Sequence, residues 1–113
     1  MKKDSKSFLL DIEHAIKDIQ GYLHGMKKED FFVNILIQDG SIRKLSIIGE
    51  AVKNLPRPIK NSEADIPWKK IAGMRDIVVH DYSELDLNVI WNTIQEGLSP
   101  LEKAIRRLLK KQI

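Results

Sequence analysis

Cysteine is absent from the chain, which excludes disulfide bonds, a thiol nucleophile and cysteine-ligated zinc. Long apolar runs are also missing. A membrane-spanning helix needs about 20 consecutive apolar residues, and the runs here are only a few residues long. The basic N-terminus is not followed by the apolar core of a secretory signal, because Asp11 and Glu13 interrupt it. We therefore expect a cytoplasmic protein that does not enter a membrane.

Neither sign of charge is in strong excess. The 19 lysines and arginines stand against 16 acidic residues, and the resulting formal charge of +3 is mild beside that of a dedicated nucleic-acid binder. The basic residues that crowd both ends of the chain fit solvated helix ends. The composition, 42% apolar and 31% charged over 113 residues, is that of an ordinary globular protein. It predicts one domain, residues 1–113, that is large enough to bury a core.

Apolar residues recur every three or four positions in four or five segments, and no segment alternates as a strand would. The first such segment is residues 8–23. A second begins near Asp30 and reaches Ile37. Residues 38–40 then either break it or only kink a longer helix that continues to Leu55. The candidate caps for the start of the first helix are Asp4, Ser5 and Ser7.

The one clear loop is residues 54–67, which hold three of the four prolines. Pro67 can then occupy the first turn of the next helix. The last helix has a heptad seam that suits an antiparallel bundle or a partner helix, and Pro100 within it predicts a kink or a brief break. We therefore predict an all-α fold, an up-and-down antiparallel bundle of four to five helices. The seam consists of Leu87, Trp91, Ile94, Leu98, Leu101, Ile105 and Leu108.

The segment GMRDIVVHDYSELD, residues 73–86, carries the candidate chemistry. It places Arg75 five residues before His80 and seven before Tyr82. A histidine near neutrality takes a proton from one oxygen and gives one to another, and an arginine has a planar fork of donors that suits phosphate oxygens. Together they could cleave RNA without a metal ion. The alternative is that these are plain surface residues at a charged helix end.

Other familiar reaction centres are not found. There is no glycine-rich phosphate loop and no H-E-x-x-H sequence. His14 has acidic neighbours within helical reach, but no second histidine joins it to complete a metal site. His14 is therefore expected on a helix surface, and His24, beside Gly25, at a helix end.

In an unbroken helix the three motif side chains do not share one face. Five residues turn a helix by roughly 140° beyond a full revolution, whereas seven return almost to the same face. Arg75 and Tyr82 would then align while His80 points elsewhere. The site needs either a helix end near His80 or a second copy of the chain. The S-x-x-D pattern at residues 83–86 supports an end close by.

Three segments give the motif a recognisable context: LSIIGEAVKNL at 45–55, IPWKKIAGMRDIVVHDY at 66–82 and VIWNTIQEGLSPLEKAI at 89–105. With them, the whole chain resembles the HepT-like toxins of the HEPN superfamily. The shared signature is R-x-x-x-x-H-x-Y, which this chain spells with Arg75, His80 and Tyr82.

The resemblance implies a helical-bundle homodimer in which the motif arginine and histidine of both subunits face a shared cleft. It implies a metal-independent ribonuclease without a cofactor, acting as the toxin of a type VII toxin–antitoxin pair. The cognate MntA-like minimal nucleotidyltransferase antitoxin silences such toxins by transferring AMP from ATP to the motif tyrosine. Carried over, Arg75 and His80 are catalytic residues that act on RNA, and Tyr82 is the site of AMPylation, where the new phosphate would lie beside Arg75.

Two acidic residues are candidates for a supporting role. Many relatives have asparagine directly after the motif arginine, where this chain has Asp76, and this aspartate either orients the catalytic groups or weakens RNA binding. Glu50, in IIGEA, is expected near the cleft, although it could equally pair within the bundle. The rival function is a non-catalytic helical subunit that binds a nucleotidyltransferase partner or a nucleotide.

Overall fold

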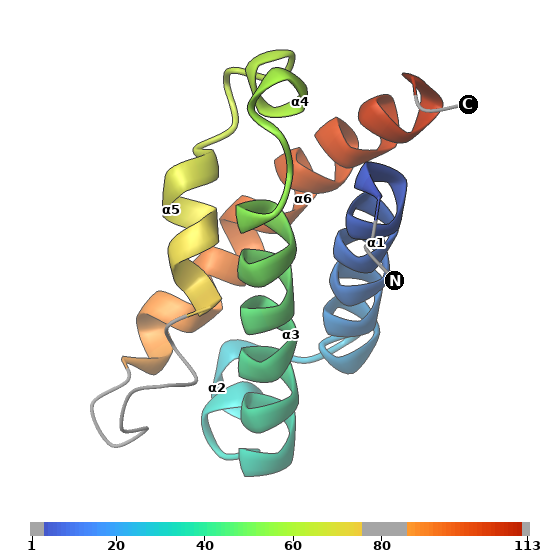
Figure 1. The fold of residues 1–113 in the computed structure, drawn as a ribbon. Coiled ribbons are helices and arrows are strands. Elements are labelled where there is room, and N and C mark those ends of the chain that lie inside the picture. Colours follow the sequence, from blue (N-terminus) through green and yellow to red (C-terminus); the bar gives the residue numbers. More distant parts are fainter. Residues whose placement is uncertain (1–3, 76–85, 112–113) are drawn as a thin grey trace.

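The structure is a computed structural model that describes residues 4–75 and 86–111. Within those ranges it contains helices and no strand, which confirms the all-α class (Figure 1). Three long helices form the body of the bundle, and three short ones lie between them. In chain order they are α1 (Ser5–Tyr22), α2 (Lys28–Phe32), α3 (Ile35–Lys53), α4 (Arg57–Asn61), α5 (Trp68–Ala72) and α6 (Leu87–Lys111).

The core lies where α1 packs against both α3 and α6. Each helix contributes a stripe of buried aliphatic side chains spaced by three or four residues, as an amphipathic helix requires. Figure 1 shows α1 and α3 running in opposite directions. Burial of one such side chain stabilises the fold by about 1.5–3 kcal/mol. The best-buried members are Leu9, Ile12, Ile16 and Ile19 of α1, Leu45, Ile48 and Val52 of α3, and Leu101, Ile105 and Leu108 of α6.

The heptad seam of α6 faces the protein's own core. Five of its seven residues are buried, and the other two, Leu87 and Trp91, pack half-buried against the same core. Of the two alternatives predicted at Pro100, a kink or a brief break, the break is wrong. Pro100 is exposed, and α6 continues through it from Leu87 to Lys111. None of the described helices is both long and apolar enough to cross a membrane.

The start of α1 agrees with one of the predicted caps. The carboxylate of Asp4 accepts a hydrogen bond from the backbone N–H of Ser7 at 2.9 Å, which satisfies one of the unpaired donors of the first turn. Gly25, just beyond the other end, has a φ of 75°, a conformation that glycine adopts without strain.

Of the two alternatives at residues 38–40, the structure excludes a helix break at that point. The chain breaks at Val33 and Asn34, where the Asn34 side chain accepts from the backbone N–H of Ile37 at 3.0 Å and caps α3. Helix α3 then passes through Gly40 without interruption. A Cβ at Gly40 would lie 3.3 Å from the ring of Tyr22, so this glycine gives that ring room against α3.

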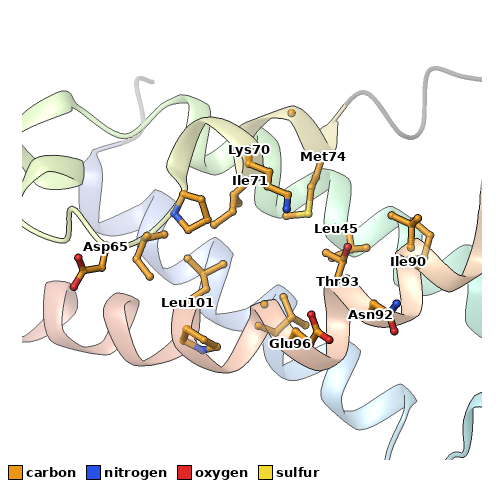
Figure 2. Close-up of a pocket in the computed structure, with 17 residues that line it drawn as sticks. Leu45, Asp65, Lys70, Ile71, Met74, Ile90, Asn92, Thr93, Glu96 and Leu101 are labelled. Atoms are coloured by element: carbon orange, nitrogen blue, oxygen red, sulfur yellow. The ribbon is translucent and has the colours of Figure 1, made fainter.

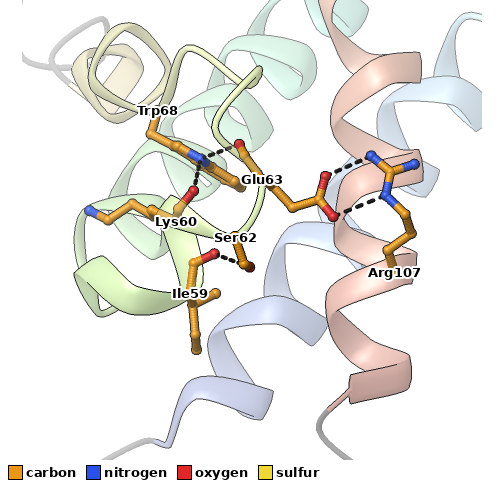
Figure 3. A network of polar contacts seen from close by, with 6 residues as sticks. All are labelled: Ile59, Lys60, Ser62, Glu63, Trp68 and Arg107. Atoms are coloured by element: carbon orange, nitrogen blue, oxygen red, sulfur yellow. Dashed lines mark hydrogen bonds and ion pairs between the residues drawn. The ribbon is translucent and has the colours of Figure 1, made fainter.

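The proline-rich loop contains a short helix, α4, that the sequence did not predict. Two prolines sit at its start, where a missing N–H costs nothing. The indole N–H of Trp68 donates to the backbone oxygens of Lys60 and Glu63 at 2.9 and 3.0 Å. The Glu63 carboxylate in turn accepts two bonds from Arg107 of α6, at 3.0 and 2.7 Å (Figure 3). These contacts hold the start of α5 against α4 and α6.

Candidate active site

Arg75 ends the tight turn of residues 73–75 that follows α5. Its guanidinium Nη1 donates to Oε2 of Glu50, on α3, at 3.1 Å. Both side chains remain open to solvent, with 40% of Arg75 and 56% of Glu50 exposed. The motif arginine is thus held by an ion pair and is still accessible to a ligand from outside.

The backbone of Arg75 rests against the same face of α3. Gly49 is buried there, and a Cβ on it would lie 2.5 Å from the backbone nitrogen of Arg75. No real Cβ tolerates such a contact, so only glycine permits this close approach. The Ser46 hydroxyl donates to the backbone oxygen of Arg75 at 3.3 Å. Ser46, Gly49 and Glu50, which we call the α3 cradle, therefore hold both the backbone and the side chain of Arg75.

The ion pair affects the titration of Glu50. The hydrogen bond from Arg75 lowers the pKa of Glu50 below its ordinary value of 4.5, and the positive charges of Arg75 and Lys53 act in the same direction. Partial desolvation opposes this effect without cancelling it. At neutral pH Glu50 is therefore a carboxylate that neutralises the charge of Arg75.

A groove of about 820 Å³ lies between α5 and α6 beside this turn (Figure 2). Its lining includes Met74, the residue directly before Arg75. The lining is mainly apolar, and Lys70 from α5 and Glu96 from α6 bring opposite charges to it (Figure 2). The volume is that of a small-molecule site, but the mixed charges do not select an anion. In the described ranges, no three His, Asp or Glu side chains gather closely enough to hold a metal ion.

Comparison with known proteins identifies the family. The family model for ribonuclease HepT-like proteins matches residues 12–108, which is most of the chain. The chain belongs to the HepT-like ribonuclease family. The probable ribonuclease HepT of Thermococcus cleftensis is 38% identical over 110 residues, which cover 97% of this chain and 100% of that relative.

Two further relatives have ribonuclease names. A Methanocaldococcus jannaschii protein, whose name combines a gamma-glutamylcyclotransferase with an RNase assignment, is 36% identical over 111 residues. The match covers 98% of this HepT-like chain but only 50% of that longer relative. The mRNA nuclease HepT of Shewanella oneidensis is 43% identical over 37 residues, covering 33% of this chain and 28% of that relative. No solved structure matches the chain significantly.

Membership in the HepT-like family confirms the resemblance inferred from the sequence. Among the five candidate residues, the structure brings Arg75 and Glu50 together. Asp76, His80 and Tyr82 lie outside the described residues.

Two members of the α3 cradle, Ser46 and Gly49, were not among the sequence candidates. Their spacing contained a usable signal, because residues at i, i+3 and i+4 share one face of a helix. Ser46, Gly49 and Glu50 have this spacing. The sequence alone did not show that this face of α3 contacts Arg75.

Proposed function

We propose that the protein is a metal-independent endoribonuclease and the toxin of a type VII toxin–antitoxin pair. The observation that carries the proposal is the anchored and solvent-accessible guanidinium of Arg75 in a chain of the HepT-like ribonuclease family. A guanidinium in this position offers a fixed fork of donors to the non-bridging oxygens of a phosphodiester.

In the proposed reaction, the ribose 2′-oxygen attacks phosphorus and the bond to the 5′-oxygen breaks. His80 serves as the acid–base group that takes the 2′-hydroxyl proton or protonates the leaving 5′-oxygen. Arg75 stabilises the negative charge that builds up on the phosphorus oxygens. The products are a 2′,3′-cyclic phosphate end and a free 5′-hydroxyl. A water molecule can then open the cyclic phosphate to a 3′-phosphate, and no step needs a metal ion.

The regulation that we propose acts through Tyr82. A minimal nucleotidyltransferase antitoxin transfers AMP from ATP to the phenol oxygen and releases pyrophosphate. The added phosphate group is negatively charged and bulky, so it would compete with RNA for Arg75. The active form is a homodimer whose two copies of Arg75 and His80 share one cleft.

Exposed apolar residues at the junction of α2 and α3 support the view that this protein works with a protein partner. Val33, Ile35 and Leu36 are 82%, 70% and 81% exposed and lie within four consecutive residues of the chain. Neighbouring exposed apolar side chains of this size are typical of protein contact surfaces. The rival function, a non-catalytic docking subunit, loses the support of the α6 seam, because that seam packs into the protein's own core.

The test is cleavage of a labelled single-stranded RNA by the purified protein in EDTA. Unmodified wild-type protein should cut it, and His80→Ala and Arg75→Ala should each lose activity by about 10²-fold or more. Matched controls are His14→Ala and Arg106→Ala, because both residues are exposed and belong to α1 and α6 rather than to the α3 cradle. Circular dichroism reports folding, and mass spectrometry reports whether Tyr82 carries AMP.

Two outcomes would contradict the proposal. Equal cleavage by His80→Ala would remove that residue's assigned role. A complete lack of cleavage by unmodified wild-type protein across varied RNAs would favour the non-catalytic subunit. Toxicity of the wild-type protein in cells, relieved by His80→Ala and by co-expression of the antitoxin, is the matching expectation in vivo.

A further inference from the structure

The α3 cradle suggests a role for Glu50 that goes beyond general support of the bundle. Glu50 contacts the functional end of Arg75, whereas Ser46 and Gly49 contact its backbone. The backbone of Arg75 would stay in place without the carboxylate, because Ser46 and the close contact at Gly49 are independent of it. The carboxylate therefore acts on the guanidinium alone.

We propose that Glu50 is a positioning residue that holds the Arg75 guanidinium in place until an RNA phosphate takes over as its partner. A carboxylate and a phosphate both pair with the same planar fork of donors. In the free protein Glu50 occupies part of the fork at 3.1 Å. Binding of a phosphodiester is then an exchange of anions at Arg75, and this inference rests on the proposed function of Arg75.

The exposure of the pair allows such an exchange. More than half of the Glu50 side chain is open to solvent, so water and salt already weaken its attraction to Arg75. A pair of this kind contributes little stability and separates readily. A deeply buried carboxylate would instead pay a large desolvation cost on losing its partner.

Two substitutions separate the effect of the Glu50 charge from its effect on the orientation of the Arg75 guanidinium. Glu50→Gln keeps an oxygen that accepts from Arg75 but removes the negative charge that competes with phosphate. Glu50→Ala removes both. If Glu50 positions Arg75, both variants should bind RNA more tightly than wild type, but only Glu50→Ala should turn over more slowly.

Binding is measured on an RNA with 2′-O-methyl riboses, which cannot be cut by attack of the 2′-oxygen. Glu50→Gln should lower its Kd roughly three- to tenfold, as expected from removing one nearby like charge at a solvated site. In an Arg75→Ala background the same substitution should change Kd by less than about twofold, because there is no longer a guanidinium for which the two anions compete.

Turnover is measured on ordinary RNA. Glu50→Gln should keep kcat within about twofold of wild type, while Glu50→Ala should lose about tenfold through a misaligned guanidinium. The matched control is Glu102→Gln, which removes the carboxylate of the Glu102–Arg106 pair within α6. It should change neither Kd nor kcat.

Two results would overturn the inference, and they have different consequences. If Arg75→Ala abolishes cleavage while both Glu50 variants match wild type in Kd and kcat, Glu50 has no positioning role and the proposed function stands. If Arg75→Ala binds and cuts RNA like wild type, the positioning role and the proposed function of Arg75 fail together.

Discussion

A single methyl group added at Gly49 tests how closely Arg75 depends on α3. In Gly49→Ala the new Cβ would lie 2.5 Å from the backbone nitrogen of Arg75 and 3.0 Å from the backbone oxygens of Ala72 and Ile71. All three atoms belong to backbone, so no side chain can rotate away to relieve the contact. Helix α3 and the 71–75 segment must move apart.

Two opposing effects set the magnitude. Overpacking of a tight contact costs about 1–3 kcal/mol, whereas replacing a mid-helix glycine by alanine contributes about 1 kcal/mol of helix stability. Because the contact with Arg75 is far below van der Waals distance, we place the cost near the upper end, for a net loss of about 1–2 kcal/mol. For a domain of this size that loss lowers Tm by roughly 4–8 °C.

The assay is thermal or urea unfolding followed by circular dichroism, with Gly97→Ala as the matched control. Gly97 lies in the middle of α6 with open space around its Cβ position, so the same methyl group should raise stability by up to about 1 kcal/mol. RNA cleavage by Gly49→Ala should also fall, because the Arg75 backbone is displaced. A Gly49→Ala protein as stable as Gly97→Ala would refute the close approach.

Two further predictions concern polar groups away from Arg75. The Ser41 hydroxyl is fully buried and has no hydrogen-bond partner among the described residues, so Ser41→Ala should leave stability unchanged or raise it by up to about 1 kcal/mol in urea unfolding; a larger loss would reveal a partner. Arg107 lowers the pKa of Glu63 below its ordinary 4.5, so the carboxylate stabilises the fold above that pH and this contribution disappears as pH falls through the lower, folded-state pKa. Glu63→Gln should therefore be less stable than wild type at pH 7 and approach wild type as the pH falls below 4.5 in unfolding titrations, whereas a constant difference would exclude the charged pair as the cause.

The three long helices were predictable because their apolar residues repeat with the helical period. The boundary between α2 and α3 was not. The sequence left open whether residues 38–40 break the helix or only kink it, and in the structure Gly40 lies inside α3 against the ring of Tyr22. The true break needs Asn34 as a cap and the side chain of Gln38 donating to the backbone oxygen of Phe31 at 2.9 Å. The contact between Gln38 and Phe31 depends on how α2 packs back against α3, and the local pattern of apolar residues does not predict that packing.

For the candidate site, the sequence predicted Arg75 from its chemistry and Glu50 as a nearby polar group, but not the contact between them. The two residues are 25 positions apart and belong to different elements. Helical spacing shows that Ser46 and Gly49 share a face with Glu50. It does not show what that face contacts, because contact between helices is decided by tertiary packing.

The position of Arg75 depends on contacts with neighbouring elements more than on the short helix α5 that precedes it. Helix α5 has five residues, far fewer than the 12 or more that an isolated helix needs to be even marginally stable. Contacts at both ends of α5 supply the stability that so short a helix lacks. At its start, Trp68 is bonded to the backbone that precedes it, and Glu63 connects that backbone to α6. At its end, Gly49 of the α3 cradle admits the backbone of Arg75. A change on α3 can therefore disturb the proposed phosphate site even though it lies outside the R-x-x-x-x-H-x-Y motif.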